Sequence, residues 1–152
     1  MKLSKNFSLA EYSKSNTAAL KGIDNEPSDE HLDFAIRLFE AVIQPVRDNF
    51  GPTRITSGFR SFELNEAIGG SQTSQHSKAQ ACDFECSGTD NKEVVEWIID
   101  NLDFDQLILE FYDDTDINSG WIHCSYVDEE SNRNQVLRAV KEDGRTVYKH
   151  GL

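Results

Sequence analysis

The chain has 152 residues and a mass of 17.2 kDa, with 38% hydrophobic and 28% charged residues, which favours one globular domain over residues 1–152. Its 15 Lys and Arg against 27 Asp and Glu give a net charge of −12, so we expect no nucleic-acid partner. No apolar run is long enough for membrane insertion, and the start lacks the apolar region of a signal peptide, so we expect a cytoplasmic protein as synthesised. Three cysteines cannot all pair within one chain, which fits a reducing compartment.

Capping signals and hydrophobic periodicity predict helices in the first third of the chain. Residues 8–11 have the spacing of a capping box, so a short helix is expected to begin near Ser8 and to fade near Asn16. Residues 27–28 introduce the strongest helical pattern. Its apolar residues recur at spacings of three and four: Leu32, Ala35, Ile36, Phe39, Val42, Ile43 and Val46. Pro45 removes a donor inside this run, so a kink or an early end is expected there.

The rest of the chain predicts short strands with two helices among them. Strands are expected at 54–57, 81–85, 106–111, 121–126, 136–141 and 145–148, and helices at 62–68 and 91–101. The last two strands are joined through Asp-Gly, a hairpin signal. Because helices come first and strands follow, the order favours an α+β fold, in which helices are followed by an antiparallel sheet.

Three residues have the types and spacing of metal ligands. His76 and Asp83 lie seven residues apart, and His123 closes the segment Trp121-Ile-His123. Two imidazoles and one carboxylate leave the fourth position of a tetrahedral zinc ion open, which is typical of a catalytic site. A structural interpretation also stands, in which the three are a turn residue, a buried ion-pair partner and a half-exposed strand residue. Residue types and spacing alone leave both open.

The neighbouring residues resemble a known family over most of the chain. The matching blocks are Ser57-Gly-Phe-Arg60-Ser, Leu64-Asn65 with Ile68-Gly-Gly-Ser71, Ser74-x-His76-x-x-Ala-x-Ala81-x-Asp83, and Trp121-Ile-His123. Together they resemble the zinc D-alanyl-D-alanine carboxypeptidases, a family that also contains L-alanyl-D-glutamate endopeptidases, many of them phage lysins. The resemblance implies the hedgehog/D,D-peptidase fold and one Zn²⁺ ion held by His76, Asp83 and His123. It also implies that Arg60 polarises the scissile carbonyl or stabilises the oxyanion.

Two positions depart from the family pattern. The glycine usual three residues after the first ligand is Ala79 here, which matters only if that backbone needs a positive φ. The acidic residue that better-known members have three residues before the last histidine is Gly120 here. The resemblance is therefore to the branch in which the preceding strand supplies the acidic residue, and the general base is expected at Glu110.

Strand alternation gives an argument for Glu110 as the general base that does not depend on the family resemblance. If Leu107, Leu109 and Phe111 face the core, Glu110 points to the other face, and an antiparallel neighbour can bring it beside His123. The alternative is a solvated glutamate on an exposed sheet face. A hydrolytic zinc site needs a carboxylate base, which favours the catalytic interpretation.

These patterns predict a zinc metallopeptidase that hydrolyses peptidoglycan stem peptides, of the D-Ala-D-Ala carboxypeptidase or L-Ala-D-Glu endopeptidase type. Ser74 is expected to bind the substrate carboxylate or to orient its loop. The enzyme is expected to act on the cell wall after release or as part of a phage particle. Because Gly120 replaces the usual base, a catalytically inactive zinc-binding module of the same fold, in wall binding or in a virion, stays open.

Two further patterns have structural explanations. Alternation places Cys82 and Cys124 on the opposite strand faces from Asp83 and His123, as small buried hydrophobes. A cysteine hydrolase, inhibited by a thiol reagent rather than by a chelator, is the remaining rival enzyme. The acidic run 113–118 lacks the glycine and glutamate of an EF-hand loop, and we expect a solvated turn.

Overall fold

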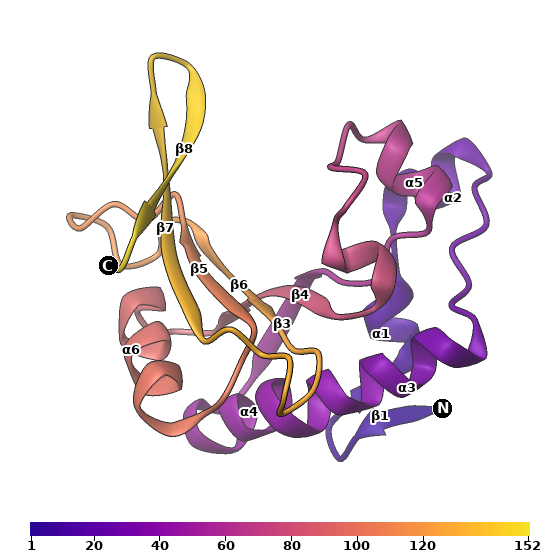
Figure 1. Cartoon of the computed structure of the whole chain (residues 1–152), viewed down its shortest axis with the longest axis horizontal. Helices are drawn as coiled ribbons and strands as arrows, with labels where there is room; N and C mark the ends of the chain where they lie inside the picture. Colours follow the sequence, from indigo (N-terminus) through magenta and orange to yellow (C-terminus); the bar gives the residue numbers. More distant parts are fainter.

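A six-stranded sheet forms the centre of the computed structural model, which describes residues 1–152 (Figure 1). Its strands are β3 (Thr53–Ser57), β4 (Ala81–Cys86), β5 (Gln106–Glu110), β6 (Trp121–Ser125), β7 (Gln135–Glu142) and β8 (Arg145–His150). Their order is β3-β4-β6-β5-β7-β8, and every neighbouring pair is antiparallel except β5 and β7, which run parallel. The α+β class is confirmed, with one parallel pair in an otherwise antiparallel sheet.

Four helices pack on one face of this sheet and contribute to the main core: α1 (Leu9–Ser13), α3 (Asp29–Leu38), α4 (Gln44–Phe50) and α6 (Asn91–Asn101). Two short helices, α2 (Asn16–Lys21) and α5 (Phe62–Ala67), lie beyond the end of the sheet and outside this core (Figure 1). Buried residues of α3, α4 and α6 share one cluster with Leu107, Leu109, Ile122 and Cys124 of the sheet. None of the helices has the length and apolar character needed to cross a membrane.

The N-terminal segment contains more elements than expected. Ser8 begins α1 with the predicted capping box, in which its Oγ accepts from the Glu11 N–H and the Glu11 carboxylate accepts from the Ser8 N–H. The helix ends at Ser13, and a second helix, α2, begins at Asn16 with Ser15 as its cap. A two-stranded sheet of β1 (Lys2–Ser4) and β2 (Phe7–Ser8) precedes both. The β1–β2 pair is too short to leave a periodic pattern.

Pro45 changes the long helical segment without ending it. Helix α3 passes into a π-helical turn at Phe39–Ile43 and continues as α4 to Phe50. Because proline has no backbone N–H, one hydrogen bond is lost near the start of α4, and the wider turn accommodates that loss. The predicted early end of the helix at Pro45 is therefore wrong, and a π-helical turn interrupts the helix instead.

The pairing of β4, β6 and β5 places the chemistry-bearing residues on one face. Asp83 pairs with His123, and His123 pairs with Ile108. Two pairs further along, Trp121 lies opposite Glu110. Since successive residues of a strand point to opposite faces, these side chains point away from the helices. The alternation argument is confirmed for Leu107, Leu109 and Glu110. Phe111 was wrongly expected on the core face: it follows the end of β5 with a φ of 53° and packs against the separate cluster of Ile108, Leu137 and Ala139.

Candidate metal centre

A cavity of about 870 Å³ lies on the sheet face that points away from the helices. All of the site residues expected from the sequence line it: Arg60, Ser74, His76, Asp83, Glu110 and His123. They come from a loop, a 3₁₀ helix and three strands, so the tertiary structure brings together segments far apart in the chain.

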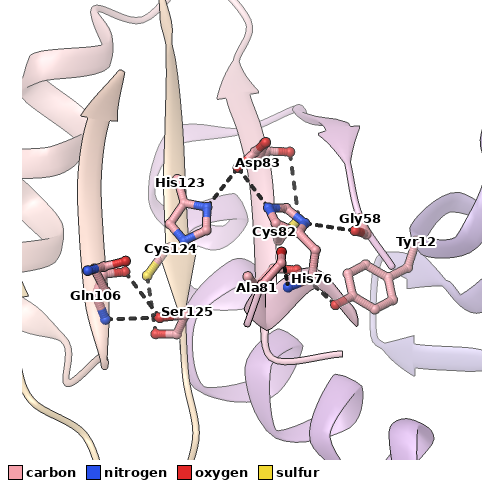
Figure 2. Close-up of polar contacts among 11 residues, drawn as sticks. Tyr12, Gly58, His76, Ala81, Cys82, Asp83, Gln106, His123, Cys124 and Ser125 are labelled. Carbon is pink, nitrogen blue, oxygen red and sulfur yellow. Dashed lines mark hydrogen bonds and ion pairs between the residues drawn. The ribbon is translucent and has the colours of Figure 1, made fainter. Parts of the chain in front are cut away.

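His76, Asp83 and His123 could hold a metal ion at the floor of this cavity. Each offers one ligand atom, and these atoms lie within 4.8 Å of one another. The Asp83 Oδ1 atom is 3.3 Å from His76 Nε2 and 3.0 Å from His123 Nδ1 (Figure 2). Burial acts to raise the pKa of Asp83, but hydrogen bonding to the two histidines outweighs it and holds that pKa well below its usual range. Asp83 is therefore ionised at neutral pH.

The hydrogen bond between His76 and Gly58 tests whether these residues fit a cation. His76 Nδ1 lies 2.8 Å from the Gly58 carbonyl oxygen, which can only accept, so Nδ1 carries the proton. Burial lowers the pKa of His76 and favours the neutral ring, whose Nε2 is then an acceptor. With the neutral ring, Nε2 and the Asp83 carboxylate are two acceptors that face one another, an arrangement that a bound cation would satisfy. Two histidines and a carboxylate are a zinc donor set, so the residues present fit zinc.

The cysteines beside these ligands have no place in the site. Cys82 and Cys124 are free thiols that are fully buried among the core residues on the helix side of the sheet. Burial raises the pKa of both thiols far from the range of a reactive thiolate. This arrangement argues against a cysteine nucleophile.

Backbone hydrogen bonds hold Arg60 at the rim of the metal centre. Its N–H donates to the His76 carbonyl oxygen at 3.2 Å. The side-chain amide of Asn25 donates to the Phe59 carbonyl at 3.0 Å and accepts from the Ser61 N–H at 2.7 Å, which fixes the backbone on both sides of Arg60. No local pattern identified Asn25, because its two partners beside Arg60 lie more than thirty residues away, and its third partner, the Ser13 carbonyl, lies twelve residues away.

The Arg60 side chain has donor capacity left for a ligand. Its Nε atom is buried and has no hydrogen-bond partner. Burial lowers the pKa of Arg60, while the negative charges of Asp83 and Glu110 oppose that shift. A buried, unpaired N–H beside two carboxylates is a donor that a bound substrate can use.

Two glycines of the blocks that define the resemblance allow close packing. A Cβ atom at Gly58 would overlap the Tyr12 carbonyl oxygen, and one at Gly70 would overlap the amide of Asn65. Asn65 is buried and donates to the Ser71 carbonyl at 2.7 Å. These glycines therefore bring α1 against the Arg60 loop and close the loop that precedes His76.

Ser74 and Ala79 delimit the 3₁₀ helix Gln75–Lys78, which presents His76. The Ser74 Oγ accepts from the His76 N–H at 3.3 Å, so Ser74 is the N-cap and orients this short helix. Ala79 ends it with a φ of 58°. The position therefore does need the positive φ that a glycine adopts freely, and the alanine adopts it at a cost of about 1–2 kcal/mol.

Glu110 lies on the cavity face of β5, two residue pairs along the sheet from His123. Burial, with a smaller contribution from the charge of Asp83, raises the pKa of Glu110 to about 7, against the opposing effects of His123 and Arg60. A carboxylate with a pKa near neutrality is suited to accept and return a proton. A bound cation would lower this pKa by favouring the charged form.

The backbone around Gly120 explains why no acidic residue stands there. Gly120 has a φ of 67°, and a Cβ atom would overlap the carbonyl oxygen of Glu110. Only glycine fits this close approach between the start of β6 and the end of β5.

The acidic run after β5 lies outside the cavity. Asp113, Asp114 and Asp116 are exposed and are absent from the cavity lining. Asp113 accepts hydrogen bonds from the backbone and hydroxyl of Thr115, as in a local turn. The structure thus contains the solvated acidic turn expected from the sequence.

Asp105 anchors the 3₁₀ helix and was not expected to matter for the site. Its buried carboxylate accepts from Gln75 Nε2 at 2.8 Å and from Arg133 Nη2 at 2.9 Å on one oxygen. The other oxygen accepts from the Arg133 N–H and Nε. Since Gln75 precedes His76, Asp105 connects the sheet to the segment that presents a ligand.

Asp105→Asn is expected to lower the free energy of unfolding by about 1–3 kcal/mol near pH 7, because it weakens charge-assisted hydrogen bonds. Burial acts to raise the pKa of Asp105, but the bonds from Arg133 and Gln75 outweigh it and lower the pKa below the ordinary 3.8. This stabilisation is therefore present above that value and is lost as pH falls through the folded-state pKa. Urea unfolding of metal-free protein near pH 7 and near pH 3 measures it. A parent-to-variant difference that is equal at both pH values would contradict the assignment.

Comparison with known protein families finds one family model that matches this chain. The model of the family described as Peptidase M15 matches residues 5–125, which include all the cavity residues expected from the sequence. No curated protein matches the chain. The matched segment ends with β6, so β7 and β8 lie outside it.

Proposed function

Because this chain belongs to the peptidase M15 family of zinc-dependent metallopeptidases, we propose that it hydrolyses peptidoglycan stem peptides, as a D-Ala-D-Ala carboxypeptidase or an L-Ala-D-Glu endopeptidase. The observation that carries the proposal is the meeting of a zinc donor set, Arg60 and Glu110 in one cavity. Such a substrate lies in the cell wall, so the enzyme would act there after release or as part of a phage particle.

His76, Asp83 and His123 would hold the zinc ion. When bound, zinc supplies Lewis-acid chemistry that polarises a carbonyl group and lowers the pKa of water. The hydrogen bond from His76 Nδ1 to the Gly58 carbonyl fixes the tautomer that leaves Nε2 free for the metal. Asp83 stays ionised, so its charge offsets part of the charge of the cation.

Glu110 would be the general base. It faces the same cavity as the three ligands and accepts a proton from the attacking water as the amide carbonyl is attacked. The same carboxyl group then returns the proton to the leaving amine. Its raised pKa supports this role, because a carboxylate that binds a proton near neutral pH can take part in both transfers.

Arg60 would stabilise the negative charge that develops on the carbonyl oxygen. Its buried Nε has no hydrogen-bond partner, and it lines the same cavity as Glu110 and the metal-ligating residues. Donors fixed in place before the reaction stabilise the transition state without reorganisation.

The cavity repels an acidic peptide less than the rest of the surface does. Arg60 and Lys78 balance the two carboxylates that line it, Asp83 and Glu110, and the charge of Arg133 is paired with Asp105, whereas the whole chain has a net charge of −12. A bound zinc ion would add positive charge, so a carboxylate-bearing stem peptide is favoured in the cavity over the rest of the surface. We place the substrate carboxylate near Ser74, whose loop forms the adjacent wall.

Arg60→Ala is expected to lower kcat/KM on the order of a hundredfold or more, by analogy with the loss of one oxyanion donor. Zinc content and the unfolding temperature should stay those of the parent, because the side-chain Nε makes no hydrogen bond that holds the fold. Arg54→Ala is the matched control, since Arg54 is exposed on β3 and pairs with Glu85 outside the cavity. If Arg60→Ala hydrolyses the substrate at the rate of the parent, the side chain does not stabilise the oxyanion and Arg60 is only a turn residue.

Mass spectrometry of purified muropeptides tests the proposed function. Zinc-loaded protein should remove the terminal D-alanine or cleave after L-alanine, and the product identifies which amide is hydrolysed. A chelator should stop the reaction, and added zinc should restore it. A zinc-loaded protein that leaves every muropeptide unchanged would overturn the proposal in favour of an inactive zinc-binding module.

A further inference from the structure

The hairpin of β7 and β8 forms the outer wall of the cavity. Alternate residues of these strands, Gln135, Leu137, Tyr148 and His150, line it together with the metal-ligating residues. In Figure 1 the hairpin lies at the end of the sheet and extends away from the helices. These strands lie outside the segment that matches the family, so this wall is a feature of this chain's own C-terminal part.

The sheet register places Tyr148 level with Glu110. Tyr148 lies directly opposite Ala139 on β7, and Ala139 lies directly opposite Glu110 on β5. Neighbouring strands are about 4.8 Å apart, so the backbones of Tyr148 and Glu110 are separated by about 10 Å. All three residues lie on the same face of the sheet, so a gap of one strand, β7, separates the tyrosine from the proposed base.

An apolar strip forms the floor of this gap. Ile108, Leu137 and Ala139 pack together as a cluster separate from the main core. Ile108 and Leu137 reach the cavity but are only 5% and 7% exposed, and Ala139 is fully buried. Such a floor offers a small apolar contact within a mostly polar cavity, and it suits one small aliphatic group.

The aromatic ring of Tyr148 is the exposed apolar surface next to this strip. Its side chain is 54% exposed, although it lines a cavity rather than the convex surface. Burial raises the pKa of Tyr148, and the charges of Glu110 and Asp83 raise it further, so its hydroxyl lies within electrostatic reach of the site. An aromatic ring that is open to a cavity gains contact area at low entropic cost when a ligand covers it.

We infer that Tyr148 is a substrate-binding residue that holds a small aliphatic side chain, of the size of an alanine methyl group, against Ile108 and Leu137, the two residues of the strip that line the cavity. This inference rests on the proposed function, because it takes the scissile amide to lie between Glu110 and the metal ligands. Strand β8 thereby contributes specificity, because a small side chain next to the amide would contact both the ring and the strip.

Binding measurements in the Glu110→Gln background separate this role from turnover. An alanine-containing muropeptide, titrated into the zinc-loaded protein by calorimetry, should bind on the order of tenfold more weakly when Tyr148 is replaced by Ala. Tyr148→Phe should change the affinity by no more than about twofold, because the ring makes the contact. Lys149→Ala is the matched control, since Lys149 is the next residue on the opposite strand face and makes only an exposed ion pair with Glu142. Equal losses for Tyr148→Phe and Tyr148→Ala would overturn the assignment to the ring.

Turnover of paired peptides, with alanine or valine next to the scissile amide, tests the specificity. The parent should prefer alanine, and Tyr148→Ala should reduce that preference while zinc content and unfolding temperature stay unchanged. If the parent hydrolyses muropeptides but Tyr148→Ala binds and discriminates as the parent does, the inference is wrong and the proposed function stands. If the parent hydrolyses none, the proposed function fails, and the binding measurements alone decide the role of Tyr148.

Discussion

Glu110→Gln is expected to abolish measurable hydrolysis, with a loss in kcat of about 10²–10⁴-fold, while zinc content persists. The amide has the shape of the carboxylate but cannot accept the proton of the attacking water. Muropeptide turnover and elemental analysis on the same preparation measure the two properties.

The same variant makes a prediction about stability. The pKa of Glu110 is about 7 in the folded protein against an ordinary 4.5, so the folded state disfavours the ionised form. Ionisation therefore costs stability as pH rises from the unfolded value to the folded value, and the glutamine removes this cost. The metal-free variant should unfold at a temperature equal to or above that of the parent near pH 8. A large drop instead would show that Glu110 holds the fold.

The acidic turn supplies matched controls for Glu110. Asp113→Asn, Asp114→Asn and Asp116→Asn each remove one carboxylate close to β5 in sequence but outside the cavity. We expect these variants to keep rates within about twofold of the parent, as for surface changes away from a site. If one of them is inactive while Glu110→Gln turns over normally, the base belongs to the turn and the argument from the strand is wrong.

His76→Ala should remove most of the bound zinc and reduce hydrolysis to background, which is the second large effect that we expect. The parent should bind about one zinc per chain, because two histidines and one carboxylate form an open tetrahedral site. Elemental analysis after incubation with excess zinc and gel filtration measures the content. Removal of one of three ligands leaves two, which are too few to retain the ion through this treatment.

Loss of fold is the other way in which His76→Ala could lose zinc, because His76 is buried and bonded to Gly58. Circular dichroism of the variant, and reversible inactivation of the parent by a chelator, separate metal loss from unfolding. His31→Ala is the control for removal of a histidine, since His31 caps α3 and lies outside the cavity. A parent that binds no zinc in excess metal would refute the metal centre itself.

The sequence by itself determined the elements whose pattern is local. The apolar spacing of α3, the capping box at Ser8 and the alternation along β5 and β6 all depend on residues within a few positions of one another. Alternation also determined the faces, because a strand turns successive side chains to opposite sides whatever its neighbours are. For this reason Glu110 and His123 could be assigned to one face before any strand pairing was known.

Only the tertiary structure decided the strand order, the parallel pairing of β5 with β7, and the contacts that hold the site. Asn25 and Asp105 act on partners 34 and 28 residues away, and no spacing rule relates such positions. Gly120 is explained by the backbone of the adjacent strand, and Tyr148 enters the cavity through two strand pairings. These features arise when the core closes and joins segments that are distant in the chain, and local periodicity contains no information about which segments those are.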